Sequence, residues 1–242
     1  MKRNLLFATM ALVAGSLMAA ESSPKDEVTA AAKKLAEKSN YSWKVTTDFG
    51  PESQFPPFVS EGRAEKDGLV WLSSTFNDNT TDGVLKDKKV AVKTADGWKS
   101  AEEAISSAGE GGFDPGANMA RRLQNNFKTP TAEVEDLVSR VKEIKKDGDA
   151  YSGELTEDGA KARLTFGFGR RGGQAPPQAT NAKGSVKFWI KDGIITKYES
   201  KASGRQEFGG EERDIQRNTT IEIKDVGTTK LALPEEAKKK LS

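Results

Sequence analysis

Several stretches of the chain alternate apolar and polar residues, which is the pattern of β-strands with one buried face. The first begins at Tyr41, where Trp43, Val45 and Thr47 occupy every second position. Later stretches are often separated by Asp-Gly pairs, which favour the tight turns of β-hairpins. Strands are predicted in this way over residues 41–49, 58–66, 69–76, 84–86, 89–94, 151–155, 184–191, 194–208 and 214–226.

Other stretches repeat apolar residues every three or four positions, which predicts amphipathic helices. The clearest covers residues 130–145, where Thr129 can cap the helix and Pro130 fits its first turn. Its apolar stripe consists of Val134, Leu137, Val138, Val141 and Ile144. Further helices are predicted over residues 24–38, 100–107, 117–125, 156–164 and 234–241.

This order of elements predicts an α+β fold. Most strands follow one another through short turns, so they form a single large antiparallel sheet, while the helices gather in the middle of the chain. The strands over residues 194–208 and 214–226 are long, and such lengths suit a strongly curved sheet.

The N-terminus has the pattern of a secretory signal peptide. Lys2 and Arg3 precede an apolar run over residues 5–18, and small residues follow before the polar chain begins. The run is short for a membrane span. We therefore expect residues 1–20 to be a cleaved signal peptide and residues 21–242 to form one domain. That domain is expected to be periplasmic or extracellular.

Composition excludes several classes of protein. The absence of cysteine excludes disulfides and also an acylated cysteine anchor, so we expect no lipid anchor. The absence of histidine removes the usual general base, the commonest metal ligand and the Ser-His and Cys-His nucleophiles. Lys2 and Arg3 account for the formal net charge of +2, so no overall field attracts nucleic acid. We expect no enzymatic activity, no cofactor, no metal and no nucleic-acid partner.

Three motifs that resemble functional sites are interpreted as incidental or structural. Residues 167–172 match the dinucleotide fingerprint, but Pro176 and Pro177 prevent the helix that must follow. Residues 78–89 resemble a calcium loop, but Lys89 stands where a chelating glutamate is needed. A group of carboxylates near a predicted hairpin turn is interpreted as keeping a strand edge soluble. Its members are Glu207, Glu211, Glu212 and Asp214.

Four stretches carry a resemblance to a known family. They are Asp96-Gly97-Trp98, residues 113–130, residues 184–190 and residues 220–234. With the order of elements, these stretches resemble the LolA-like superfamily of periplasmic lipid and lipoprotein carriers, and within it the LppX and LprG lipoproteins. The resemblance implies an open half-barrel, which is a strongly curved antiparallel sheet with helices covering its concave face. Acyl chains would lie in an apolar cavity between the two layers.

Ligand-binding residues are predicted from the apolar positions that would face such a cavity. The sheet-side wall is predicted to consist of Trp43, Val45, Leu72, Phe188, Ile190, Tyr198 and Ile221. The helical lid is predicted to consist of Met119, Leu123 and Leu137.

Three functional hypotheses follow. The first is a soluble periplasmic carrier or binding protein for lipids or acylated lipoproteins. The alternative is a non-catalytic protein-interaction module of the cell envelope with a solid core, which would use an exposed sheet edge or the loop over residues 109–116. The third, an acid–base hydrolase, needs two carboxylates that converge in a cleft. Its candidates are Glu61, Glu65, Glu207 and Glu212.

Overall fold

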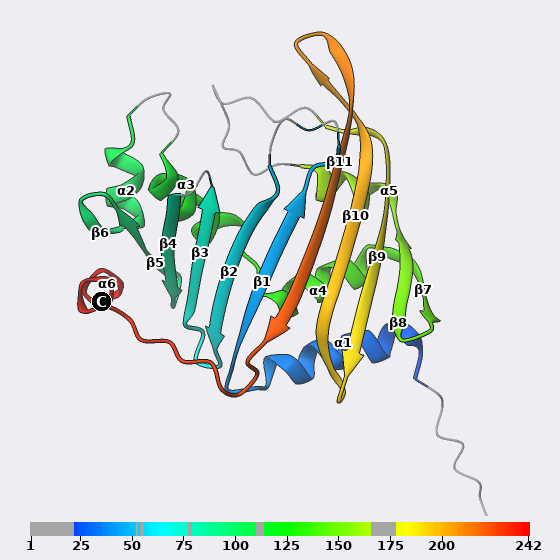
Figure 1. Ribbon diagram of the computed structural model, residues 1–242, viewed down its shortest axis with the longest axis horizontal. Helices are drawn as coiled ribbons and strands as arrows, with labels where there is room; N and C mark the ends of the chain where they lie inside the picture. The colour runs from blue at the N-terminus through cyan, green and yellow to red at the C-terminus, as the bar shows by residue number, and fades with distance from the viewer. Residues whose placement is uncertain (1–21, 52, 54–55, 77–78, 110–113, 166–177) are drawn as a thin grey trace, which may run out of the picture.

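One antiparallel sheet forms the body of the protein in the computed structural model (Figure 1). The structure describes residues 22–51, 53, 56–76, 79–109, 114–165 and 178–242. The predicted signal peptide and the glycine-rich motif at residues 167–172 lie outside these ranges. Within them, the strands are β1 (Asn40–Asp48), β2 (Phe58–Glu65), β3 (Val70–Phe76), β4 (Asn79–Lys86), β5 (Lys89–Thr94), β6 (Gly97–Ser100), β7 (Val141–Asp147), β8 (Ala150–Leu155), β9 (Thr180–Lys191), β10 (Ile194–Phe208) and β11 (Glu211–Lys224).

The strand order shows two meanders that meet in the middle of the sheet. It runs β6-β5-β4-β3-β2-β1-β11-β10-β9-β8-β7, so the strands on each side of the centre follow their neighbours in sequence. The two halves join where β1 pairs with β11, with Val45 opposite Ile221. In Figure 1 the blue β1 and the orange β11 accordingly lie side by side. The predicted α+β class and open sheet are confirmed.

The helices are α1 (Pro24–Ala36), α2 (Ala101–Ser107), α3 (Pro115–Arg121), the π-helical turn η1 (Arg122–Asn126), α4 (Pro130–Ser139), α5 (Glu157–Leu164) and α6 (Glu235–Leu241). Figure 1 shows α1, α4 and α5 behind the sheet, on its concave side. Their starts follow capping rules, because Ser23 and Thr129 accept hydrogen bonds from backbone N–H groups and a proline follows each of them.

Helix α6 packs on the opposite face of the sheet. On β5, Val90 and Val92 belong to the main core, which includes residues of α2 and α3, whereas Ala91 between them packs with Ala237 of α6. Trp71 and Trp98 complete this second core and meet edge to face, with ring centroids 5.8 Å apart. The β4–β6 end of the sheet is therefore covered on both faces.

The helix predicted over residues 130–145 is wrong in its second half. Helix α4 ends at Ser139, and Val141 begins β7, which pairs with β8. An irregularity in the β7–β8 register between Val141 and Ile144 lets both side chains stay buried in a strand, although their spacing is helical. Pairing along the sheet edge thus overrides a local pattern that fits a helix.

Candidate functional site

The concave face changes from apolar to polar along its central strands. Near the start of β1, Tyr41 and Trp43 are buried in the main core. Toward its end, Thr47 lies opposite Thr219 of β11, and Ser200 of β10 lies opposite Thr219 on the other side. These three hydroxyl side chains are also buried, so a polar band crosses the sheet interior.

A pocket of about 80 Å³ lies where the apolar and polar parts of this face meet. Its apolar wall is formed by Trp43, Val45, Leu72, Phe127 and Ile221. The rings of Trp43 and Phe127 are stacked, with centroids 6.4 Å apart. Phe127 follows η1 directly, so the π-helical turn and the start of α4 hold an aromatic ring over the central strands.

The polar wall of the pocket is an ion network centred on Glu133 of α4. Arg163 of α5 donates from Nη1 to Glu133 Oε1 at 2.7 Å, and the Tyr198 hydroxyl donates to Glu133 Oε2 at 2.9 Å. Both carboxylate oxygens are therefore engaged. Arg217 of β11 donates to the backbone carbonyl of Arg163 at 3.4 Å, and Arg122 of η1 donates to the Ser74 hydroxyl at 3.4 Å.

Burial and mutual repulsion shift the pKa values of these groups. Burial lowers the pKa of the Arg122 guanidinium. Burial, followed by repulsion from Arg163, lowers the pKa of Arg217 to about 10. Burial, followed by the negative charge of Glu133, holds the pKa of Tyr198 well above its usual value. At neutral pH the guanidinium of Arg217 is therefore charged and the hydroxyl of Tyr198 is a hydrogen-bond donor.

The predicted ligand-binding residues divide into two groups. One group lines the pocket and consists of Trp43, Val45, Leu72, Tyr198 and Ile221. The other packs in the same main core without lining the pocket and consists of Met119, Leu123, Leu137, Phe188 and Ile190. Met119 and Leu123 lie against Gly83 of β4, where an added Cβ would meet Leu123 Cδ1 at 2.6 Å. The helical lid is thus in direct contact with the sheet.

The arginines of the pocket are absent from the predicted residues. Arg217 had a usable signal, because it falls between Ile215 and Thr219 at an inward-facing position of a period-two strand. A charged residue at such a position indicates a buried polar group that needs partners. Arg122 and Arg163 had no comparable signal, because both lie on short helices whose charged faces are ordinarily exposed.

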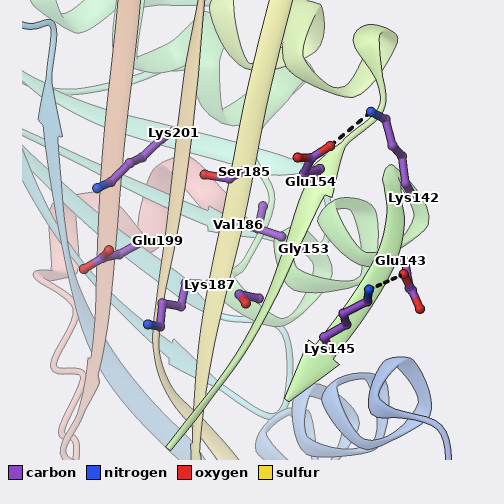
Figure 2. Close-up of a pocket in the computed structure, with 11 residues that line it drawn as sticks. Lys142, Glu143, Lys145, Gly153, Glu154, Ser185, Val186, Lys187, Glu199 and Lys201 are labelled. Carbon is purple, nitrogen blue, oxygen red and sulfur yellow. Dashed lines mark hydrogen bonds and ion pairs between the residues drawn. The ribbon is translucent and has the colours of Figure 1, made fainter. Parts of the chain in front are cut away.

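A larger hollow, of about 600 Å³, lies on the outer face of β7–β10. Its charged side chains are largely paired, as Figure 2 shows for Lys142 with Glu154 and for Lys145 with Glu143, at 3.2 and 3.1 Å. Nearby, the ammonium groups of Lys187 and Lys197 lie 5.6 and 4.6 Å from the centroid of the Trp189 ring. Lysines and glutamates that pair across a solvated sheet face are typical of a soluble surface, and this hollow has no apolar wall for an acyl chain.

The carboxylates near the β10–β11 turn also form surface pairs. Arg205 reaches Asp214 at 3.2 Å, and Arg213 reaches Glu211 at 3.1 Å. Among the described residues no group of three or more His, Cys, Asp or Glu side chains is arranged to hold a metal ion. Nor does that part of the chain contain a helix long and apolar enough to cross a membrane.

Comparisons with known proteins give structural matches only. No protein-family model matches the chain, and no curated protein matches its sequence. The structure is similar to that of LprF from Mycobacterium bovis, with 12% identity and a TM-score of 0.44, covering 88% of this chain and 97% of that one. Lipoprotein LppX from Mycobacterium tuberculosis matches with 11% identity and a TM-score of 0.43, over 87% and 98% of the two chains.

A LolA superfamily protein from Nitrosomonas europaea matches with 13% identity and a TM-score of 0.34, over 87% of this chain and 96% of that one. LppX and a LolA superfamily protein, which belong to the family that the sequence resembles, thus both occur among the similar structures. The fold itself rests on the sheet and helices described above.

Proposed function

We propose that this protein is an exported, soluble carrier or binding protein for lipids or acylated lipoproteins, which it holds between sheet and helices in the periplasm. The supporting observation is the pocket between the central strands and the start of α4, with its wall of Trp43, Phe127 and Ile221. A buried aromatic and aliphatic wall beside a few converging polar groups is the usual composition of a small-molecule site.

An acyl chain requires the helical cover to move. The pocket of about 80 Å³ has room for roughly two or three waters, at about 30 Å³ each. The cover consists of short pieces, α3, η1 and α4, and π-helical turns such as η1 often occur at functional sites. Separation of these pieces from the sheet would expose Met119, Leu123 and Leu137 to the ligand.

The free energy gained by burying the ligand can offset the cost of separating the helical cover from the sheet. Each methylene removed from water contributes about 0.8 kcal/mol, so about twelve methylenes contribute roughly 10 kcal/mol. Once the cover has separated, Phe188 and Ile190 would extend the sheet-side wall beyond the residues that line the pocket in this structure.

The proposal is tested by native mass spectrometry of the purified protein and by uptake of a fluorescent fatty acid. We expect a co-purified lipid and saturable uptake. Val45→Trp fills the pocket from the sheet side and should abolish uptake, whereas Thr46→Trp places the same ring on the outer face and should leave it unchanged. A wild-type protein that carries no lipid and takes up no fatty acid contradicts the proposal.

A second candidate, an envelope interaction module with a solid core, is favoured by the packing of the interior. Leu137, Phe188 and Tyr198 have no exposed surface. In that case a protein partner would pair with an edge strand, β6 or β7, and the interior would never open. Val45→Trp would then only destabilise the fold, and hydrogen exchange in α4 would be unaffected by any lipid.

A further inference from the structure

A row of buried hydroxyl side chains crosses the concave face of the sheet. Thr47 of β1, Thr219 of β11 and Ser200 of β10 lie opposite one another on neighbouring strands. Ser60 of β2 lies opposite Val45, the preceding inward residue of β1. Six polar side chains are buried in the part of the chain that the structure describes, and these four hydroxyls are among them. We refer to the four as the hydroxyl row, which is polar but carries no charge.

The hydroxyl row has unused hydrogen-bonding capacity. The Ser60 side chain is 1% exposed, and its Oγ is buried without a hydrogen-bond partner among the described residues. The Thr47 and Thr219 hydroxyls are 3.4 Å apart, which is long for a hydrogen bond between two hydroxyls. Most buried hydroxyls in native proteins have a partner. One unpaired member and two weakly paired members can therefore bond to a ligand.

The hydroxyl row begins where the apolar wall of the pocket ends. Val45 and Ile221 lie opposite each other and line the pocket, and Thr47 and Thr219 are the next inward residues on the same two strands. Thr219 also lines the pocket. A strand rises about 3.3 Å per residue, so roughly 7 Å separate the apolar positions from the hydroxyls. An acyl chain on the apolar wall would thus have its first polar atoms beside the hydroxyl row.

The first polar group of an ester-linked acyl chain is a carbonyl, and its chemistry suits these side chains. Serine and threonine hydroxyls rotate freely enough to donate to a carbonyl oxygen. A carbonyl is uncharged and only accepts hydrogen bonds, so its burial leaves neither a charge nor a donor unsatisfied. A charged head group would need a counter-charge, which the hydroxyl row lacks.

We infer that the hydroxyl row of Thr47, Ser60, Ser200 and Thr219 binds the ester carbonyl oxygens of an acylated ligand. The acyl chain lies on the apolar wall, and the head group lies beyond the hydroxyl row. This inference rests on the proposed carrier function and adds the chemical group that the carrier recognises. Ester-linked chains are therefore preferred to ether-linked chains of the same length.

The test compares two water-soluble lipids that differ only in their carbonyl groups. Dihexanoyl phosphatidylcholine carries two ester-linked chains, and its dihexyl ether analogue carries the same head group and chains of the same length. Calorimetric titration of the full chain measures both dissociation constants. We expect the ester to bind at least about fivefold more tightly, which corresponds to roughly 1 kcal/mol, the usual net contribution of one neutral hydrogen bond.

Two variants locate this preference on the hydroxyl row. Ser60→Ala and Thr47→Val each remove one hydroxyl and should reduce the ester preference about threefold, without weakening binding of the ether. Because the Ser60 hydroxyl has no partner in the free protein, Ser60→Ala should not lower the melting temperature, whereas loss of a purely structural hydrogen bond would. Ser185→Ala removes an exposed hydroxyl from the outer face and should leave the preference unchanged.

The outcomes separate the two proposals. An ester preference that weakens in Ser60→Ala or Thr47→Val supports the hydroxyl row, and if Thr47→Val fails to fold, Ser60→Ala alone decides. Equal binding of ester and ether contradicts the hydroxyl row and leaves the carrier function standing, as does an ester preference that both variants retain. Absence of binding by both lipids contradicts the carrier function and this inference with it.

Discussion

At the scale of single residues, the centre of the sheet depends on one close contact. The indole of Trp43 lies directly over Gly62 of β2, its partner across the strand pair. A Cβ built at Gly62 would lie 2.1 Å from Trp43 Cζ2. The glycine is therefore required for the ring to reach Phe127 and form the pocket wall.

Gly62→Ala should destabilise the protein by about 1–3 kcal/mol, because the indole must leave its packed position. Urea denaturation followed by tryptophan fluorescence measures this change. Gly109→Ala is the matched control, since a Cβ there meets nothing within 4 Å. Equal transition midpoints for the two variants would show that Trp43 has room to shift.

Glu133→Gln should destabilise the protein by about 3 kcal/mol, because it removes the carboxylate that pairs with Arg163 and accepts from the Tyr198 hydroxyl. The Glu133 side chain is 20% exposed, so solvent screens it only weakly. Glu143→Gln, at a side chain that is 69% exposed, should change the free energy of unfolding by less than about 0.5 kcal/mol. Urea denaturation of the two variants measures this difference, and equal free energies of unfolding would contradict it.

At the scale of elements, the strands and helices that the sequence predicts best are those with turn signals at both ends. Strand β10 is observed at its predicted bounds because Asp192-Gly193 and Gly209-Gly210 fix both ends, and all four residues adopt positive φ. Helix α4 is shorter than predicted, because sheet pairing decides the structure after Ser139. Half of the predicted wall and lid lines the pocket. The prediction does not include Arg217, because it takes only apolar residues at inward-facing strand positions, nor Arg122 and Arg163, because charged residues on short helices are ordinarily exposed.

Helix α6 offers an element-scale prediction, because Ala237 is fully buried against the outer face of β5 and β6. Ala237→Asp should expose Trp71 and Trp98 and cost about 2 kcal/mol or more, since the new carboxylate has no buried partner. Lys239→Asp places the same residue on the exposed side of the helix and serves as the control. Hydrogen exchange should show α6 detached in the first variant only, and equal protection in both would contradict this packing.

At the scale of the whole molecule, the proposed role needs an exported chain with a sheet that stays intact while its helical cover moves. Neighbouring strands pair continuously from β6 to β7, whereas the cover over the pocket is divided among α3, η1 and α4. The sheet is thus the rigid layer, and the divided helices form the layer that can adapt to a ligand.

Export is checked by expressing the chain in a bacterium with and without residues 1–20. We expect the full chain in the periplasmic fraction with a mass that corresponds to a start at Glu21, and the shortened chain in the cytoplasm. Recovery of the full chain from the cytoplasm at its unprocessed mass would contradict the signal peptide.

The β1–β11 pairing has a consequence for when the fold can be completed. Strand β1 ends at Asp48, but its partner strand β11 ends only at Lys224. Nearly the whole polypeptide must therefore be synthesised before the two halves of the sheet can pair. Contacts so distant along the chain form slowly. Until then an unfinished half-sheet presents β1 as a bare edge, and a chaperone that shields this edge during synthesis would prevent aggregation.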